Sequence, residues 1–118
     1  MRPVLVHYHI YKNAGSSIDR LLQESFGEDW VQFDDTGGKD IIDSSALRGF
    51  LAARPSLRAV SSHGARPPLP VSNAYPIVML RHPVDRARSV YHFARRDRSQ
   101  PDHAVARCSS FREYIRHY

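Results

Sequence analysis

Residue types that commonly bind phosphate or sulfate gather in one short stretch near the amino terminus. Lys12, Gly15, Ser16 and Ser17 lie between an apolar run and the start of a helical pattern. A helix that begins directly after a tight loop points its free backbone N–H groups and its positive dipole end at that loop. Gly15 lets a ligand approach the backbone, the serines add hydroxyl donors, and Lys12 adds a mobile positive charge. The stretch therefore predicts an anion site.

The order of these residues differs from that of a Walker A motif. In G-x-x-x-x-G-K-[ST] the lysine follows the second glycine, whereas here Lys12 precedes the loop glycine, Gly15. An ordinary connection between a strand and a helix, with Lys12 in solvent, fits the stretch equally well when it is taken alone.

A histidine in the middle of the chain is a candidate general base. Residues 57–62 predict a strand that delivers His63 to its carboxyl end, where open α/β sheets bind their ligands. A histidine there can take a proton from a substrate hydroxyl near neutral pH. A histidine that only bonds a neighbouring loop is the open alternative.

A second anion site is predicted from Arg81 and Ser89. Residues 77–80 predict a buried strand that ends at Arg81, and Pro83 suits the first turn of a following helix. Ser89 lies two turns along that helix, so its hydroxyl and the Arg81 guanidinium can converge on one anion.

Strands and helices alternate along the chain, which predicts an α/β domain with a parallel sheet. Residues 3–10 and 30–33 predict further strands, and a solvated loop follows at Asp34–Asp40. Two adjacent aspartates in that loop are weak candidates for metal ligands. A first helix is expected to be capped by Ser16 or Ser17 and to end at Gly27, and a second to be capped by Ser44 or Ser45 and to run to about Ala53. Ser109 or Ser110 is expected to cap a last helix. Between these last two, Arg95, Arg96 and Arg98 are expected to form a solvated, basic helix end.

Composition limits the class of protein. The 118 residues fit one domain and carry a formal charge of +5, with ten arginines against four acids in residues 60–118. Such a basic half suits phosphorylated or sulfated ligands and equally a nucleic acid. Cys108 is the single cysteine and is expected to be a packing residue. No apolar run is long enough to cross a membrane, so we expect a cytoplasmic chain.

Two motifs in order resemble the sulfotransferases that use 3′-phosphoadenosine 5′-phosphosulfate, particularly the carbohydrate and heparan-sulfate O-sulfotransferases. Residues 9–17, HIYKNAGSS, resemble the 5′-phosphosulfate loop of that family, and residues 80–91, LRHPVDRARSVY, resemble its 3′-phosphate motif. The resemblance implies a P-loop-NTPase-like three-layer fold with a parallel sheet. It covers the amino-terminal portion of the family's domain, so we expect a truncated sheet.

The resemblance also implies roles for individual residues. It places Lys12 on the transferred sulfuryl group, Arg81 and Ser89 on the 3′-phosphate, and His63 as the base that deprotonates a hydroxyl acceptor such as a carbohydrate. The donor nucleotide is then held by the whole loop: Lys12, Asn13, Ala14, Gly15, Ser16 and Ser17. No metal is expected for this chemistry.

Two other classes of protein remain open. A P-loop-like nucleotide binder or kinase would prefer a magnesium-bound nucleoside triphosphate. A basic module without enzymatic activity would bind nucleic acid with a steep dependence on salt, even without Lys12. Two phosphate motifs, each in the expected position, argue against the nucleic-acid binder.

Overall fold

The computed structural model describes residues 2–34 and 41–117 and divides into two compact units, residues 1–80 and 81–118. Residues 35–40, which include most of the loop predicted at Asp34–Asp40, lie outside the described residues, as does the second of the two adjacent aspartates, Asp35.

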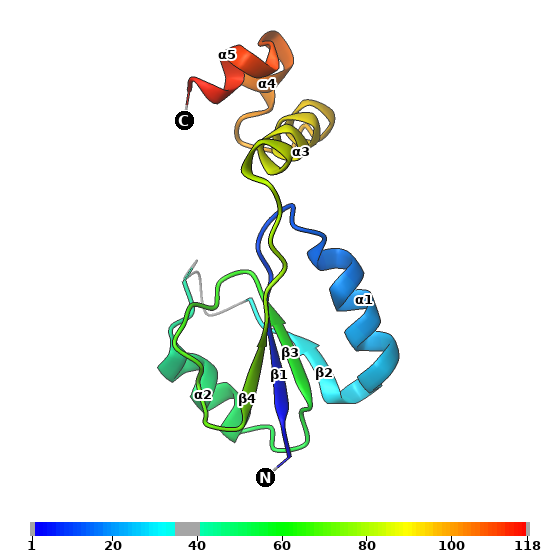
Figure 1. Cartoon of the computed structure of the whole chain (residues 1–118), viewed down its shortest axis with the longest axis vertical. Coiled ribbons are helices and arrows are strands. Elements are labelled where there is room, and N and C mark those ends of the chain that lie inside the picture. The colour runs from blue at the N-terminus through cyan, green and yellow to red at the C-terminus, as the bar shows by residue number, and fades with distance from the viewer. Residues whose placement is uncertain (1, 35–40, 118) are drawn as a thin grey trace. The chain divides into compact units, whose positions relative to one another are not determined.

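Unit 1 is built on a four-stranded sheet in which all pairs of neighbours are parallel (Figure 1). The strands run in the order β2-β3-β1-β4, so β1 lies inside the sheet, between β3 and β4. Their bounds are β1 Val4–Tyr8, β2 Trp30–Gln32, β3 Ala59–Ser62 and β4 Ala74–Ile77. The predicted α/β class with a parallel sheet is confirmed.

Two helices flank the sheet on opposite faces, α1 (Gly15–Phe26) and α2 (Ser44–Ala52) (Figure 1). Alternation along β1 explains why both faces are covered, because successive side chains of a strand point to opposite sides. Val6 packs with the α2 leucines in the main apolar cluster, whereas His7 contacts Asp19 of α1. A short 3₁₀ turn, η1 (Gly27–Asp29), joins α1 to β2.

The ends of the helices differ in part from the prediction. Ala14 is the N-cap of α1, and Ser16 and Ser17 lie in its first turn. The cap of α2 is Asp43, whose carboxylate accepts a hydrogen bond of 2.8 Å from the backbone N–H of Ala46. The predicted serine caps of both helices are therefore wrong. The predicted end of α1 at Gly27 is confirmed, with φ of 54° at that glycine.

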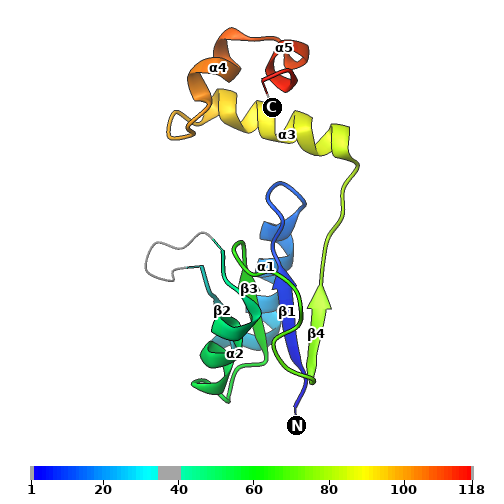
Figure 2. The ribbon, with the colours of Figure 1, turned by 90° about the vertical axis from the view of Figure 1, so that its left-hand side faces the viewer.

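The strand predicted at residues 77–80 lies earlier in the chain. β4 pairs Ala74 to Ile77 with Val4 to His7, and β1 ends one residue later, so β4 has almost no pairing partner beyond Ile77. Figure 2 shows β4 at the edge of the sheet, a position that tolerates its Pro76. Residues 78–80 follow as an exposed segment outside the sheet. Arg81 is thus four residues beyond the strand rather than at its end.

Unit 2 consists of three helices, α3 (Pro83–Arg96), α4 (His103–Cys108) and α5 (Phe111–Ile115) (Figure 2). Pro83 occupies the predicted first turn of α3, and Ser110 forms a capping box with Glu113 at the start of α5. The sequence pattern did not predict α4. A small core joins the three helices through Tyr91, Ala94, Ala106 and Tyr114. Among the described residues, no helix is both long and apolar enough to cross a membrane.

Candidate functional site

The loop between β1 and α1 has an unusual backbone. Lys12 and Ala14 both adopt the left-handed conformation, with φ of 62° and 61°. Residues with a Cβ rarely adopt it, and the resulting strain, on the order of 1 kcal/mol or more per residue, is typical of ligand-binding loops. Ala14 offers no side chain to cap α1. The first turn of the helix, with exposed Ser16 and Ser17, therefore presents uncapped backbone N–H groups to an anion.

Asn13 anchors this loop. Its side chain is buried, and its amide nitrogen donates a hydrogen bond of 3.0 Å to the carbonyl of Met79 in the segment after β4. The amide is thus engaged within the protein, which gives Asn13 a positioning role in addition to the predicted ligand contact of the loop.

Gly15 is needed because of a histidine that packs against it. A Cβ placed on Gly15 would lie 1.9 Å from Cδ2 and Nε2 of His9. The His9 ring is in turn stacked on the His63 ring, with 3.9 Å between centroids. One imidazole therefore separates the predicted base, at the end of β3, from the predicted phosphate loop.

Replacing Gly15 with alanine is expected to destabilise the protein by about 1–3 kcal/mol, because the new methyl group would overlap the His9 ring. That ring is held by the stack on His63 and by Asp19, 3.0 Å away, so it cannot simply swing aside. Urea unfolding measures the loss. Gly49→Ala in α2 is the matched control, since nothing lies within 4 Å of its added Cβ, and it should be neutral or stabilising. Equal stability of both variants would contradict this packing.

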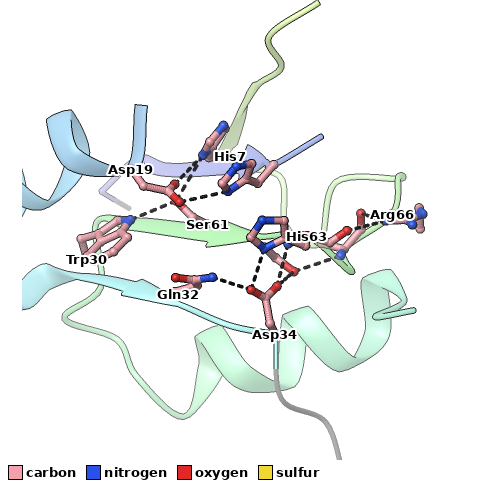
Figure 3. Close-up of polar contacts among 11 residues, drawn as sticks. His7, Asp19, Trp30, Gln32, Asp34, Ser61, His63 and Arg66 are labelled. Carbon is pink, nitrogen blue, oxygen red and sulfur yellow. Dashed lines mark hydrogen bonds and ion pairs between the residues drawn. The ribbon is translucent and has the colours of Figure 1, made fainter. Parts of the chain in front are cut away.

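His63 is oriented by Asp34 (Figure 3). Nδ1 of His63 lies 2.9 Å from Oδ2 of Asp34, while Oδ1 of Asp34 accepts a hydrogen bond of 2.6 Å from the backbone N–H of His63. Two further donors reach the same carboxylate, the hydroxyl of Ser62 and the amide of Gln32. With Nδ1 facing the carboxylate, Nε2 is the ring nitrogen left to take a proton. Asp34 lies outside β2 in an irregular segment, as predicted, but its side chain is only partly exposed and is hydrogen-bonded to His63.

The hydrogen bonds to Asp34 keep it ionised. Burial alone would raise its pKa, but the hydrogen bonds from His63 and Gln32 outweigh burial and lower the pKa to about 2. A permanent carboxylate on Nδ1 favours the tautomer in which Nε2 accepts a proton and stabilises the imidazolium that forms. The pair has the arrangement of a general base with its orienting group.

A buried polar network lies beside this pair. Nδ1 of His7 is 2.8 Å from Oδ1 of Asp19 and 3.3 Å from the hydroxyl of Ser61, which also accepts a hydrogen bond of 3.0 Å from the indole N–H of Trp30 (Figure 3). These contacts join β1, α1, β2 and β3. They hold the strand ends that carry the loop and His63.

In unit 2, Arg81 and Ser89 line one shallow hollow of about 390 Å³. Its other lining residues come from the same face of α3, at helical spacing; they are Asp85, Arg88, His92 and Arg96. Three arginines against one aspartate make the hollow attractive to an anion. Arg81 and Ser89 thus share a surface.

Three side chains that the sequence did not identify lie at, or face, the carboxyl ends of the strands. Asp34 follows β2, His9 follows β1, and Asp19 of α1 faces both His7 and His9. One available signal was the position of Asp34 just after a predicted strand, which is the argument that identified His63. The other was the His7 and His9 spacing of two residues, which puts both on one face of a strand.

Comparison with known proteins gives one relative. The chain is 31% identical, over 124 aligned positions, to an uncharacterized protein of Archaeoglobus fulgidus. The alignment covers 97% of this chain and 48% of that protein, so the chain spans about half the length of the relative. No protein-family model and no solved structure matches. The fold is that of an α/β protein with a parallel sheet, and the candidate site lies at the carboxyl ends of its strands.

Proposed function

We propose that this chain is the nucleotide-binding part of a sulfotransferase that moves a sulfuryl group from 3′-phosphoadenosine 5′-phosphosulfate to a hydroxyl acceptor. The fold would then be the amino-terminal portion of a P-loop-like domain. In support, the loop-bearing strand β1 lies inside a parallel sheet, with β3 on one side and β4 on the other. The chain crosses from one side of β1 to the other between β3 and β4, and ligands bind at such switch points.

The observation that carries the proposal is the contact of His63 with His9 and of His9 with Gly15. Through these contacts only the ring of His9 separates His63, the base that Asp34 orients, from the N-terminus of α1, which has no side-chain cap. An anion site and a base at such close range suit group transfer from an anionic donor to a hydroxyl. The loop also fits the donor, because it offers backbone N–H groups, two exposed serine hydroxyls and a lysine.

The residues of unit 1 divide the chemistry between them. Nε2 of His63 takes the proton of the acceptor hydroxyl as that oxygen forms its bond to sulfur. The bond between sulfur and the bridging phosphate oxygen breaks, and Lys12 stabilises the negative charge on the sulfuryl and bridging oxygens. The first turn of α1 holds the 5′-phosphate throughout. Adenosine 3′,5′-bisphosphate and the sulfated acceptor are the products.

Arg81 and Ser89 of unit 2 are assigned to the 3′-phosphate. The resemblance of residues 80–91 to the 3′-phosphate motif supports this assignment, and so does the hollow that both residues line. An arginine is well suited to the role because its guanidinium forms two parallel hydrogen bonds with a phosphate.

Arg81→Ala is expected to weaken binding of adenosine 3′,5′-bisphosphate by a factor on the order of 10 to 100, the value of one charged hydrogen-bonded contact. Binding of adenosine 5′-monophosphate, which lacks the 3′-phosphate, should change little. Calorimetric titration of both nucleotides into the wild-type chain and the variant isolates the 3′-phosphate.

Arg98→Ala is the matched control for that titration, because Arg98 is exposed and does not line the hollow. It should leave both affinities unchanged. Equal losses for the two nucleotides, or equal effects of the two substitutions, would contradict the assignment of Arg81 and favour a general electrostatic attraction.

A further inference from the structure

The cluster of His7, His9 and Asp19 has no chemical step in the proposed transfer. His7 and His9 are two residues apart at the end of β1, and Asp19 reaches both from α1. Oδ1 of Asp19 lies 2.8 Å from Nδ1 of His7, and Oδ2 lies 3.0 Å from Nδ1 of His9. One nitrogen from each ring and a carboxylate oxygen all lie within 4.8 Å of one another.

We propose that His7, His9 and Asp19 bind one divalent transition metal ion, with zinc as the ion that suits them best. Two imidazole nitrogens and one carboxylate oxygen are ligands that zinc accepts at about 2.0–2.2 Å. Three protein ligands leave a fourth position open to water. A hard ion such as magnesium would instead require a shell of oxygen atoms, and this cluster offers too few.

The burial of these ligands supports the proposal. The side chains of His7, His9 and Asp19 are 1%, 9% and 15% exposed, so little water competes for their polar atoms. Nδ1 of His9 is buried and makes no hydrogen bond of good geometry with any described group, despite the nearby carboxylate.

Further contacts fix the orientation of the two histidine ligands. The hydroxyl of Ser61 contacts His7 and accepts a hydrogen bond from Trp30, so the ring of His7 is fixed in orientation. The ring of His9 is fixed by Gly15 and by the stack on His63. A bound ion would tie the end of β1 to α1 across the loop. It would stabilise the fold there without entering the transfer step.

The test uses the whole chain, stripped of metal with a chelator and then titrated with zinc by calorimetry. We expect saturable binding of one ion per chain and a higher melting temperature in its presence. His9→Gln and Asp19→Asn should each weaken the affinity by more than the roughly 10- to 100-fold that loss of a supporting outer contact costs. His117→Gln is the matched control and should retain the affinity, because His117 is exposed and does not belong to the cluster.

A second measurement needs no variant. In the wild-type chain, zinc should shift the nitrogen resonances of the His7 and His9 rings and leave the ring of His117 unchanged, and cobalt should give visible bands typical of a site with nitrogen and oxygen ligands. A folded chain that binds no zinc, or binds it through other histidines, would overturn the proposal and leave Asp19 as a clamp for two rings. Adenosine bisphosphate binding would be unaffected by that failure, so the two proposals are tested separately.

Discussion

Replacing Lys12 with alanine is expected to reduce sulfuryl transfer by a factor on the order of 10² to 10³, the cost of losing one group that stabilises charge in the transition state. Binding of adenosine 3′,5′-bisphosphate should weaken but persist, because the product lacks the transferred group. The backbone conformation of Lys12 does not complicate this test. Lys12 has φ of 62°, and alanine meets about the same backbone cost as lysine there, so the effect comes from loss of the side chain beyond Cβ and its ammonium group.

Turnover of the donor, followed as release of the bisphosphate with a panel of hydroxyl acceptors that includes carbohydrates, measures this effect. Arg20→Ala is the control, because Arg20 is an exposed cation of α1 that pairs with Glu24. It should leave turnover unchanged. If Lys12→Ala and Arg20→Ala behaved alike, the assignment of Lys12 to the sulfuryl group would be wrong.

The second large effect is expected for Asp34→Asn. The substitution keeps the size of the side chain but removes the charge that faces Nδ1 of His63. Turnover should fall by a factor on the order of 10² to 10⁴, the usual contribution of a positioned general base, with bisphosphate affinity unchanged. Since the pKa of Asp34 is lowered to about 2, the wild-type carboxylate is ionised throughout the neutral range, and the loss should persist across it.

A positioning role is distinguished from a merely structural one by two further readings. Asp34→Glu retains a carboxylate and should recover part of the turnover, and His63→Gln should be about as slow as Asp34→Asn, since one removes the base and the other disables it. The double variant should be little slower than either single one. Independent, multiplying losses would contradict the view that Asp34 acts through His63.

Sequence patterns predicted those parts of unit 1 that depend on local order. The apolar run before the loop, the helical spacing after it and Gly27 at its end were enough to predict β1 and α1. His63 at the end of β3 followed from the general position of ligands in parallel sheets. These inferences use neighbours in the chain, and such neighbours are visible in the sequence.

The parts that depend on pairing between distant strands were not predictable in the same way. Asp34 reaches His63 because β2 lies next to β3, and that order is not encoded locally. The apolar residues 77–80 resembled a strand, but the length of β1 decides where β4 ends. The close approach of His9 to Gly15 likewise depends on three-dimensional packing.

The most direct test of the central claim is calorimetric titration of the wild-type chain with adenosine 3′,5′-bisphosphate, with magnesium-ATP titrated separately and as a competitor. We expect saturable binding of one bisphosphate per chain and a clear preference for it over magnesium-ATP. Preference for magnesium-ATP would indicate a P-loop-like nucleotide binder or kinase instead. No binding of the bisphosphate to a folded chain would contradict the proposed nucleotide site.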